Sequence, residues 1–217
     1  MIKTIILDFD GVIVESLGIK TQAFRELFSS YPQYLEQIMS YHLAHNSISR
    51  YIKFEYIVEH ILGENYDEER KKELGARFSH LVRQKVIECP YVAGAEEFLQ
   101  YFSPKVPLYV ASATPQEEVQ AIIRARGIDG HFKEIYGFPP WEKSQVVRKI
   151  MAEESVNADA VAYVGDSEED YKVARDTGVF FVGRINEESF DNLEIPLYQD
   201  LFGVKEHLRK IIDGNES

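Results

Sequence analysis

The sequence predicts an α/β protein in which an all-helical domain interrupts a doubly wound parallel sheet. Three observations favour this class: one apolar strand opens the chain, a long stretch of purely helical pattern follows it, and strands alternate with helices after Pro90. Such alternation forms right-handed βαβ units, and these units build a parallel sheet. Because a single strand precedes the helical stretch, we expect a sheet core of residues 1–14 and 91–217 and an inserted helical cap of residues 15–90.

The first strand is expected over Ile2–Leu7, a run of apolar and β-branched residues without a helical period. The polar sequence Asp8-Phe9-Asp10-Gly11 ends this strand. In the helical stretch that follows, Pro32 and Gly63 indicate breaks between segments. Its apolar residues recur at helical spacing in three sets: Ala23, Phe24, Leu27 and Phe28; Ile48, Tyr51, Ile52, Ile57, Val58, Ile61 and Leu62; and Leu74, Phe78, Leu81, Val82, Val86 and Ile87.

One helix after Pro90 carries a clear start signal. We expect Thr114 to cap it and Pro115 to take its first position, with Glu117 and Glu118 facing the positive end of the helix dipole. The other helices are expected over Ala95–Phe102, Lys143–Glu154, Glu168–Thr177 and Gly203–Ile212, and the strands over Val106–Ala111, Ile135–Tyr136, Ala160–Val164 and Val179–Val182. The helix that starts near Pro115 should stop at Gly127.

The composition excludes several classes of protein. The 217 residues include 24 Lys and Arg against 36 Asp and Glu, a net charge of −12, which argues against a nucleic-acid binder. The single cysteine, Cys89, excludes an internal disulfide framework and a cysteine-based zinc site. No apolar run approaches the ~20 residues that a membrane helix needs. We therefore expect a cytoplasmic protein without membrane or nucleic-acid partners.

The candidate chemistry lies where strands end, because ligands of open parallel sheets bind beyond the carboxyl ends of the strands. Asp8 and Asp10 directly follow the first strand. Their like charges raise at least one pKa unless a cation or a substrate proton offsets them. A turn needs one Asp and does not explain a pair behind a buried strand. The pair therefore favours Asp8 as a nucleophile and Asp10 as a general acid and base.

Three later strand ends carry further candidates. Ser112 can hold a phosphate oxygen together with nearby backbone N–H groups, although a serine at a strand end is also a common cap. Lys143 starts a helix, where a phosphate or carboxylates would offset its charge; a surface lysine is the alternative. Asp166 ends a strand before Glu168 and Glu169, two acids that a helix start explains by itself. Hard oxygen ligands such as Asp166 suit Mg²⁺, and the whole set predicts a phosphoryl-transfer site.

These residues resemble the motifs of the haloacid dehalogenase superfamily. Asp8-Phe9-Asp10-Gly11-Val12 is similar to its first motif, DxDGx, and Gly165-Asp166-Ser167-Glu168-Glu169-Asp170 is similar to its fourth, GDxxxD. Ser112 and Lys143 stand where its second and third motifs place a Ser or Thr and a Lys. Within the superfamily, the chain resembles the phosphoglycolate phosphatase and β-phosphoglucomutase-like subfamily. This resemblance implies a Rossmann-like core with an inserted helical cap.

The resemblance further implies a Mg²⁺-dependent phosphatase that hydrolyses a small phosphorylated metabolite, either phosphoglycolate or a sugar phosphate. Asp8 would attack phosphorus to form an aspartyl phosphate, while Asp10 would protonate the leaving group and then activate water. The carboxylates of Asp8 and Asp166 and the main-chain carbonyl of Asp10 would bind Mg²⁺. The substrate-binding residues implied by the resemblance are Gly11, Ser112, Ala113, Lys143 and Arg50, of which Ser112 and Lys143 also belong to the catalytic set.

Two assignments rest on weaker patterns. Asp170 would support Lys143 or the surroundings of the metal. Arg50 ends Asn46-Ser47-Ile48-Ser49-Arg50, which resembles the cap segment that directs an arginine at the substrate, and Lys53 could act with it. A solvated helix face is the alternative for both cap cations.

Departures from the family pattern separate the possible activities. Dehalogenases of the superfamily lack the second acid of the first motif, whereas Asp10 is present here. Phosphomutases carry a His shortly after that motif, whereas Lys20 stands at the matching place. A sugar phosphomutase is therefore the alternative to a phosphatase. A non-catalytic binding module is a third hypothesis, although such a module has no reason to hold so many acids together.

Overall fold

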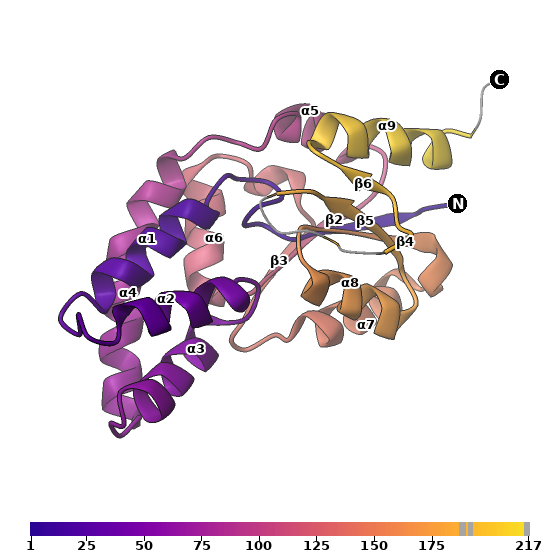
Figure 1. Cartoon of the computed structure of the whole chain (residues 1–217). Coiled ribbons are helices and arrows are strands. Elements are labelled where there is room, and N and C mark those ends of the chain that lie inside the picture. Colours follow the sequence, from indigo (N-terminus) through magenta and orange to yellow (C-terminus); the bar gives the residue numbers. More distant parts are fainter. Residues whose placement is uncertain (187–189, 191–192, 215–217) are drawn as a thin grey trace. The chain divides into compact units, whose positions relative to one another are not determined.

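The computed structural model describes residues 1–186, 190 and 193–214. The chain forms two compact units, one of Met1–Glu15 and Pro90–Ser217 and the other of Ser16–Cys89, both drawn in Figure 1. Within the described ranges, no helix combines the length and apolar character needed to cross a bilayer.

The first unit contains a six-stranded sheet in the order β3-β2-β1-β4-β5-β6. Each neighbouring pair of strands is parallel. From central β1, the chain winds outward through β2 and β3 and then in the other direction through β4, β5 and β6, which confirms the predicted doubly wound class. The strands are β1 Thr4–Leu7, β2 Leu108–Ser112, β3 Glu134–Gly137, β4 Val161–Gly165, β5 Phe180–Arg184 and β6 Leu197–Tyr198.

Helices cover both faces of this sheet. Helices α7 (Lys143–Glu154) and α8 (Glu168–Thr177) pack together on one face, and α5 (Ala95–Phe102) and α9 (Leu201–Ile212) pack together on the other, as Figure 1 shows. Helix α6 (Gln116–Ala125) packs against β3. Single 3₁₀ turns occur at Asp129–His131 (η2) and Ala158–Ala160 (η3).

A row of paired strand residues forms the core beneath α7. Ile6 of β1 pairs with Tyr109 on one side and with Tyr163 on the other, and Tyr163 pairs with Phe181. All four are buried in one apolar cluster, which also contains Val146, Val147 and Ile150 of α7. The row is continuous because parallel strands in register place paired side chains on the same face. This packing keeps the carboxyl ends of β1, β2 and β4 side by side at one edge of the sheet.

The chain leaves and re-enters the sheet unit at one place. The backbone N–H of Glu15 donates to the carbonyl of Pro90 at 3.0 Å, and Val14 and Tyr91 form an antiparallel bridge. The two crossing segments are thus paired like short strands.

The observed elements differ from the predictions in two instructive places. Strand β6 was not predicted, because two residues carry no readable period. Helix α6 begins at Gln116, so the predicted cap at Thr114 and first helical position at Pro115 are wrong: Pro115 is the N-cap, and no side chain caps the helix. The Thr114 hydroxyl instead donates to Asp10 at 2.9 Å. The predicted stop at Gly127 is confirmed by its left-handed φ of 71°.

The second unit is entirely helical among its described residues, as the pattern predicts. One element, α2, follows Pro32 and was not among the three predicted apolar sets. Ile57–Ile61 (η1) is a π-helical turn, a departure from the α-helical period that spacing alone does not reveal. The α-helices are α1 Leu17–Leu27, α2 Leu35–Ala44, α3 Arg50–Tyr56 and α4 Glu68–Glu88.

An aromatic cluster around Phe24 forms the core of the helical unit. The Phe24 ring centroid lies 5.0 Å from that of Phe78 and 5.6 Å from that of Phe54. His42 stacks on Phe24 at 4.1 Å and is 2% exposed. Burial, reinforced by the charge of Lys53, lowers the pKa of His42 to about 3. His42 is therefore neutral at physiological pH and can accept from Lys53 Nζ, which lies 3.2 Å from His42 Nδ1.

This neutral histidine should make the helical unit sensitive to acid. Because its folded pKa lies below the unfolded value of 6.5, the unfolded chain binds more protons as pH falls from about 6.5 towards 3. We expect His42→Asn to reduce the pH slope of the unfolding free energy in this range by up to about 1.4 kcal/mol per pH unit. Urea unfolding at a series of pH values checks this, and an unchanged slope would contradict it.

Candidate active site

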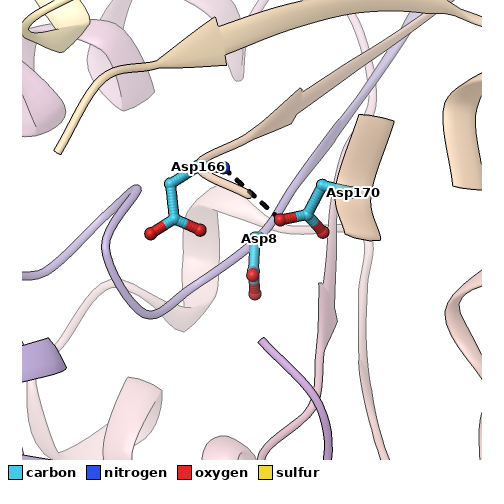
Figure 2. A group of neighbouring side chains, drawn as sticks. All are labelled: Asp8, Asp166 and Asp170. Atoms are coloured by element: carbon cyan, nitrogen blue, oxygen red, sulfur yellow. Dashed lines mark hydrogen bonds between the residues drawn. The ribbon is translucent and has the colours of Figure 1, made fainter. Parts of the chain in front are cut away.

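The sequence-predicted residues of the sheet unit gather at the carboxyl ends of β1, β2 and β4. Asp8 follows β1, Ser112 ends β2 and Asp166 follows β4. Strand β1 lies between β2 and β4, so the three positions surround the place where strand order reverses. Figure 2 shows Asp8 and Asp166 beside Asp170 of α8.

Lys143 links two of the carboxylates. Its Nζ donates to Asp8 Oδ2 at 2.7 Å and to Asp170 Oδ1 at 2.7 Å. The Lys143 side chain is 12% exposed, so the alternative of an ordinary surface lysine is wrong. Its place at the start of α7 is unfavourable to a cation, and the two carboxylates offset that cost.

The pKa values of Asp8 and Lys143 are both raised in this site. Burial is the largest influence on Asp8, and together with Asp170 it raises the pKa of the Asp8 carboxyl to about 6, although Lys143 acts in the opposite direction. Burial also opposes the charge on Lys143, but Asp170 and Asp8 outweigh it and hold the lysine pKa well above its ordinary value. Lys143 therefore remains a cation in this site.

Asp170 is a buried acceptor shared by several donors. Besides Lys143, the Tyr163 hydroxyl donates to its Oδ1 at 3.1 Å, and the Ser167 hydroxyl donates to its Oδ2 at 2.6 Å. The Ser167 side chain also accepts the Asp170 backbone N–H and thereby caps α8. Asp170 thus accepts hydrogen bonds from Lys143, Tyr163 and Ser167. Its supporting role in the reaction stays a prediction.

The motif glycine before Asp166 has a steric explanation. A Cβ atom on Gly165 would lie 2.3 Å from Asp170 Cβ and 2.7 Å from its Cγ, well inside van der Waals contact. Glycine at this position allows the Asp170 side chain to cross the end of β4. The spacing of glycine and aspartate in GDxxxD therefore reflects direct contact between its first and last residues.

Asp8 and Asp166 supply the oxygens of a possible metal site. Within the described ranges, ligand atoms of Asp8, Asp166 and Asp170 all lie within 4.8 Å of one another. Carboxylate oxygens at this spacing fit a hard divalent cation such as Mg²⁺, which binds through few carboxylates and retains water. Protein donors contact all three carboxylates: Lys143 and the Phe9 N–H donate to Asp8, Asn186 donates to Asp166, and Lys143, Tyr163 and Ser167 donate to Asp170. Hydrogen bonding alone therefore does not rank them as metal ligands.

Asp10 is bound by the segment that follows the second strand. The hydroxyl of Thr114 donates to Asp10 Oδ2 at 2.9 Å, and Asp10 is 8% exposed. Gly11 turns the chain here with a φ of 76°, and its N–H donates to the carbonyl of Val14. This left-handed conformation is costly for residues with a Cβ, which accounts for the glycine of the first motif.

The Ser112 side chain makes the local contact that its strand-end position also suggested. Its hydroxyl accepts the backbone N–H of Thr114 at 3.0 Å, and the serine is 1% exposed. Ala113 lies between these two residues. Ser112 and Ala113 are thus fixed at the end of β2, beside the loop that carries Asp10.

Arg50 and Lys53 belong to the helical unit and are buried there. Arg50 donates to Ser79 Oγ at 3.1 Å, and its guanidinium lies 4.5 Å from the centroid of the Phe78 ring. Lys53 Nζ lies 4.9 Å from the Phe24 centroid. The alternative of a solvated helix face is therefore wrong for both cations, which are 5% and 3% exposed.

Sequence reasoning missed three residues with a clear part in this geometry: Thr114, Tyr163 and Ser167. Thr114 contacts the loop after β1, Tyr163 of β4 contacts Asp170 of α8, and Ser167 caps α8. Ser167 alone carried a readable signal, because a serine before a run of acids is a typical N-cap. Thr114 was read as a helix cap, and Tyr163 as a residue of a buried strand.

A profile of haloacid dehalogenase-like hydrolases matches residues 5–184. The chain belongs to this family. No curated protein matches it. Among solved structures, this hydrolase is similar to a hydrolase from Pseudomonas syringae, with a TM-score of 0.78 and 17% identity over 96% of this chain and 99% of that one.

Two further structures resemble the hydrolase over most of their length. A predicted phosphoglycolate phosphatase from Haemophilus somnus 129PT has a TM-score of 0.76 and 17% identity, covering 95% of this chain and 98% of that one. CbbY from Rhodobacter sphaeroides in complex with phosphate has a TM-score of 0.71 and 17% identity, covering 92% and 95%. At these identities, the similarity establishes a shared fold.

The close approach of Gly165 to Asp170 can be tested by one methyl group. We expect Gly165→Ala to lower the free energy of unfolding by about 1–3 kcal/mol, because the new Cβ must displace a fully buried side chain. Urea unfolding measures the change. Gly18→Ala is the matched control: no atom lies within 4 Å of its added Cβ, so it should not destabilise the protein. Equal stabilities for the two variants would contradict the steric explanation.

Proposed function

We propose that this hydrolase is a Mg²⁺-dependent phosphatase of a small phosphorylated metabolite and that it acts through an aspartyl phosphate on Asp8. The observation that supports the proposal best is the pairing of Asp8 with the buried cation of Lys143 at 2.7 Å, beside the carboxylate of Asp166. A nucleophile, a cation for phosphate and a hard-metal ligand thus lie together. Composition, fold and motif order agree with this chemistry.

In the first step, an Asp8 carboxylate oxygen attacks phosphorus, and the bond from phosphorus to the leaving oxygen breaks. Asp10 gives its proton to that oxygen, so the alcohol leaves in neutral form. The Thr114 hydroxyl holds the Asp10 carboxyl during this transfer. In the second step, Asp10 takes a proton from water as the water attacks phosphorus, and the bond to Asp8 breaks to release phosphate.

Lys143, Ser112 and Ala113 bind the phosphoryl group in this proposal. The Lys143 ammonium balances negative charge on the phosphoryl oxygens, while Asp170 keeps the ammonium directed at Asp8. The Ser112 hydroxyl and the backbone N–H groups around Ala113 and Gly11 provide neutral donors. When bound through Asp8, Asp166 and the Asp10 carbonyl, Mg²⁺ supplies further positive charge for the transferring group.

Structural relatives support the class of substrate. CbbY from Rhodobacter sphaeroides has been seen with phosphate and, as its D10N mutant, with xylulose-1,5-bisphosphate, and YfnB from Bacillus subtilis has been seen bound to magnesium. Together with the predicted phosphoglycolate phosphatase, these proteins favour a phosphorylated acid or sugar as the substrate here. We assign Arg50 to recognition of that substrate, on its resemblance to the cap arginine of the family.

The nucleophile is tested by Asp8→Asn against a panel of phosphorylated metabolites, with and without Mg²⁺. We expect phosphate release by the unaltered protein to require Mg²⁺, and the variant to lose at least about 10³-fold in turnover because an amide cannot replace the attacking carboxylate. Asp159→Asn, at an exposed aspartate of η3, is the matched control and should retain full activity. Undiminished turnover by Asp8→Asn would refute the assignment.

Product analysis separates the two catalytic hypotheses. A phosphatase releases one phosphate for each substrate consumed, whereas a sugar phosphomutase yields an isomer and little free phosphate. The presence of Lys20 where the mutases carry a His favours phosphate release. Stoichiometric isomer formation would overturn the proposal in favour of the mutase. Absence of turnover across the panel in the presence of Mg²⁺ would favour a non-catalytic binding module.

A further inference from the structure

Asn186 contacts the Asp166 carboxylate from the neighbouring strand. Strands β4 and β5 pair in parallel with Gly165 opposite Gly183, so the segments that follow them leave the sheet side by side. Asn186 Nδ2 donates to Asp166 Oδ2 at 2.6 Å and lies 3.4 Å from the Asp166 main-chain oxygen. No sequence pattern indicates this contact, because Asn186 lies in an irregular segment beyond the predicted strand.

We propose that Asn186 is a positioning residue that orients the Asp166 carboxylate for the metal. This inference rests on the proposed function, since it concerns the same Mg²⁺ site. An ionised carboxylate offers about four acceptor positions on its two oxygens. A hydrogen bond from Asn186 to Oδ2 restricts the rotation of the carboxylate and so favours one orientation of its two oxygens.

The chemical type of the donor fits this role. An amide donates a hydrogen bond without adding charge, so the contact with Asn186 does not itself neutralise the Asp166 carboxylate. Lys143 differs, because its ammonium partly neutralises Asp8 and Asp170. A cation at position 186 would compete with the metal. Carboxylate ligands of metals are commonly held by such neutral partners, and losing one typically costs 10–100-fold in metal affinity.

The backbone that carries Asn186 is itself anchored to the site. Arg184 donates to the Gly11 carbonyl at 3.1 Å and forms an ion pair with Glu15 at 2.6 Å. The N–H of Ile185 donates to the Tyr198 carbonyl of β6 at 2.7 Å. The end of β5 is therefore tied both to the edge strand and to the loop that follows Asp8. This anchoring holds the side-chain amide of Asn186 in place against Asp166.

Calorimetric titration with Mg²⁺ alone, without substrate, tests the inference on the full chain. We expect Asn186→Ala and Asn186→Leu each to weaken Mg²⁺ binding by 10–100-fold, since both remove the donor while only the first leaves a gap. Thermal unfolding without metal should differ little among the proteins. Asn157→Ala, which changes an exposed asparagine of the same unit, should bind Mg²⁺ like the unaltered chain.

The outcomes separate this inference from the proposed function. Unchanged affinity in both Asn186 variants would overturn the inference, as would a loss confined to Asn186→Ala, because that pattern indicates packing in place of hydrogen bonding. A loss of affinity that accompanies an equal loss of metal-free stability would also overturn it. If the unaltered protein fails to bind Mg²⁺, the proposed metal-dependent function fails with it. Binding by the unaltered chain with unaffected variants refutes the role of Asn186 alone.

Discussion

Mutual repulsion among Asp8, Asp166 and Asp170 governs the arrangement of the groups around them. Their oxygens lie within 4.8 Å of one another in the interior, where low polarity strengthens the interaction between like charges. Lys143 offsets part of this charge through its contacts with Asp8 and Asp170. The neutral donors around Asp170 stabilise it further. Asp166 receives a neutral hydrogen bond from the Asn186 amide.

The sheet provides the rigidity that such a cluster needs. Strand β1 is buried along its whole length between β2 and β4, and the paired row through Ile6 packs against α7. Helix α7 begins with Lys143, so the packing that fixes the helix also fixes the ammonium. The carboxylates and their cation therefore sit on elements of one continuous core, which keeps the charged groups in register without long flexible segments.

The sequence predicted those parts of the site that depend on local pattern. The place of the acids after β1 and β4 in the site could be predicted, because each follows an apolar strand and parallel strands end at a common edge of the sheet. Hydrogen bonds between residues far apart in the sequence could not be predicted. Thr114 and Asp10 are far apart in the chain, and nothing in either segment indicates that one hydroxyl would reach the other carboxylate. Asn186 likewise depends on the register between β4 and β5, which is a property of the assembled sheet.

The remaining differences between prediction and structure have separate causes. Two-residue β6 is too short to show alternation, and the π-helical turn at Ile57–Ile61 breaks the period on which helix reading relies. The predicted start of α6 was one residue too early, because the Thr114 hydroxyl donates to Asp10 and does not cap the helix. The burial of Arg50 and Lys53 was equally hidden, since long cationic side chains pack their stems and heads against aromatic rings that lie distant in sequence.

The pairing of Glu15 with Pro90 has an evolutionary consequence. The two ends of the helical insertion lie together at Glu15 and Pro90. The sheet unit therefore folds as if these two positions were joined by a short connection, whatever the length of the segment between them. The helical unit can thus lengthen, shrink or be exchanged by recombination while the sheet retains its connections. Selection can therefore alter the helical unit without rebuilding the sheet unit, so the two parts of this chain can diverge at different rates.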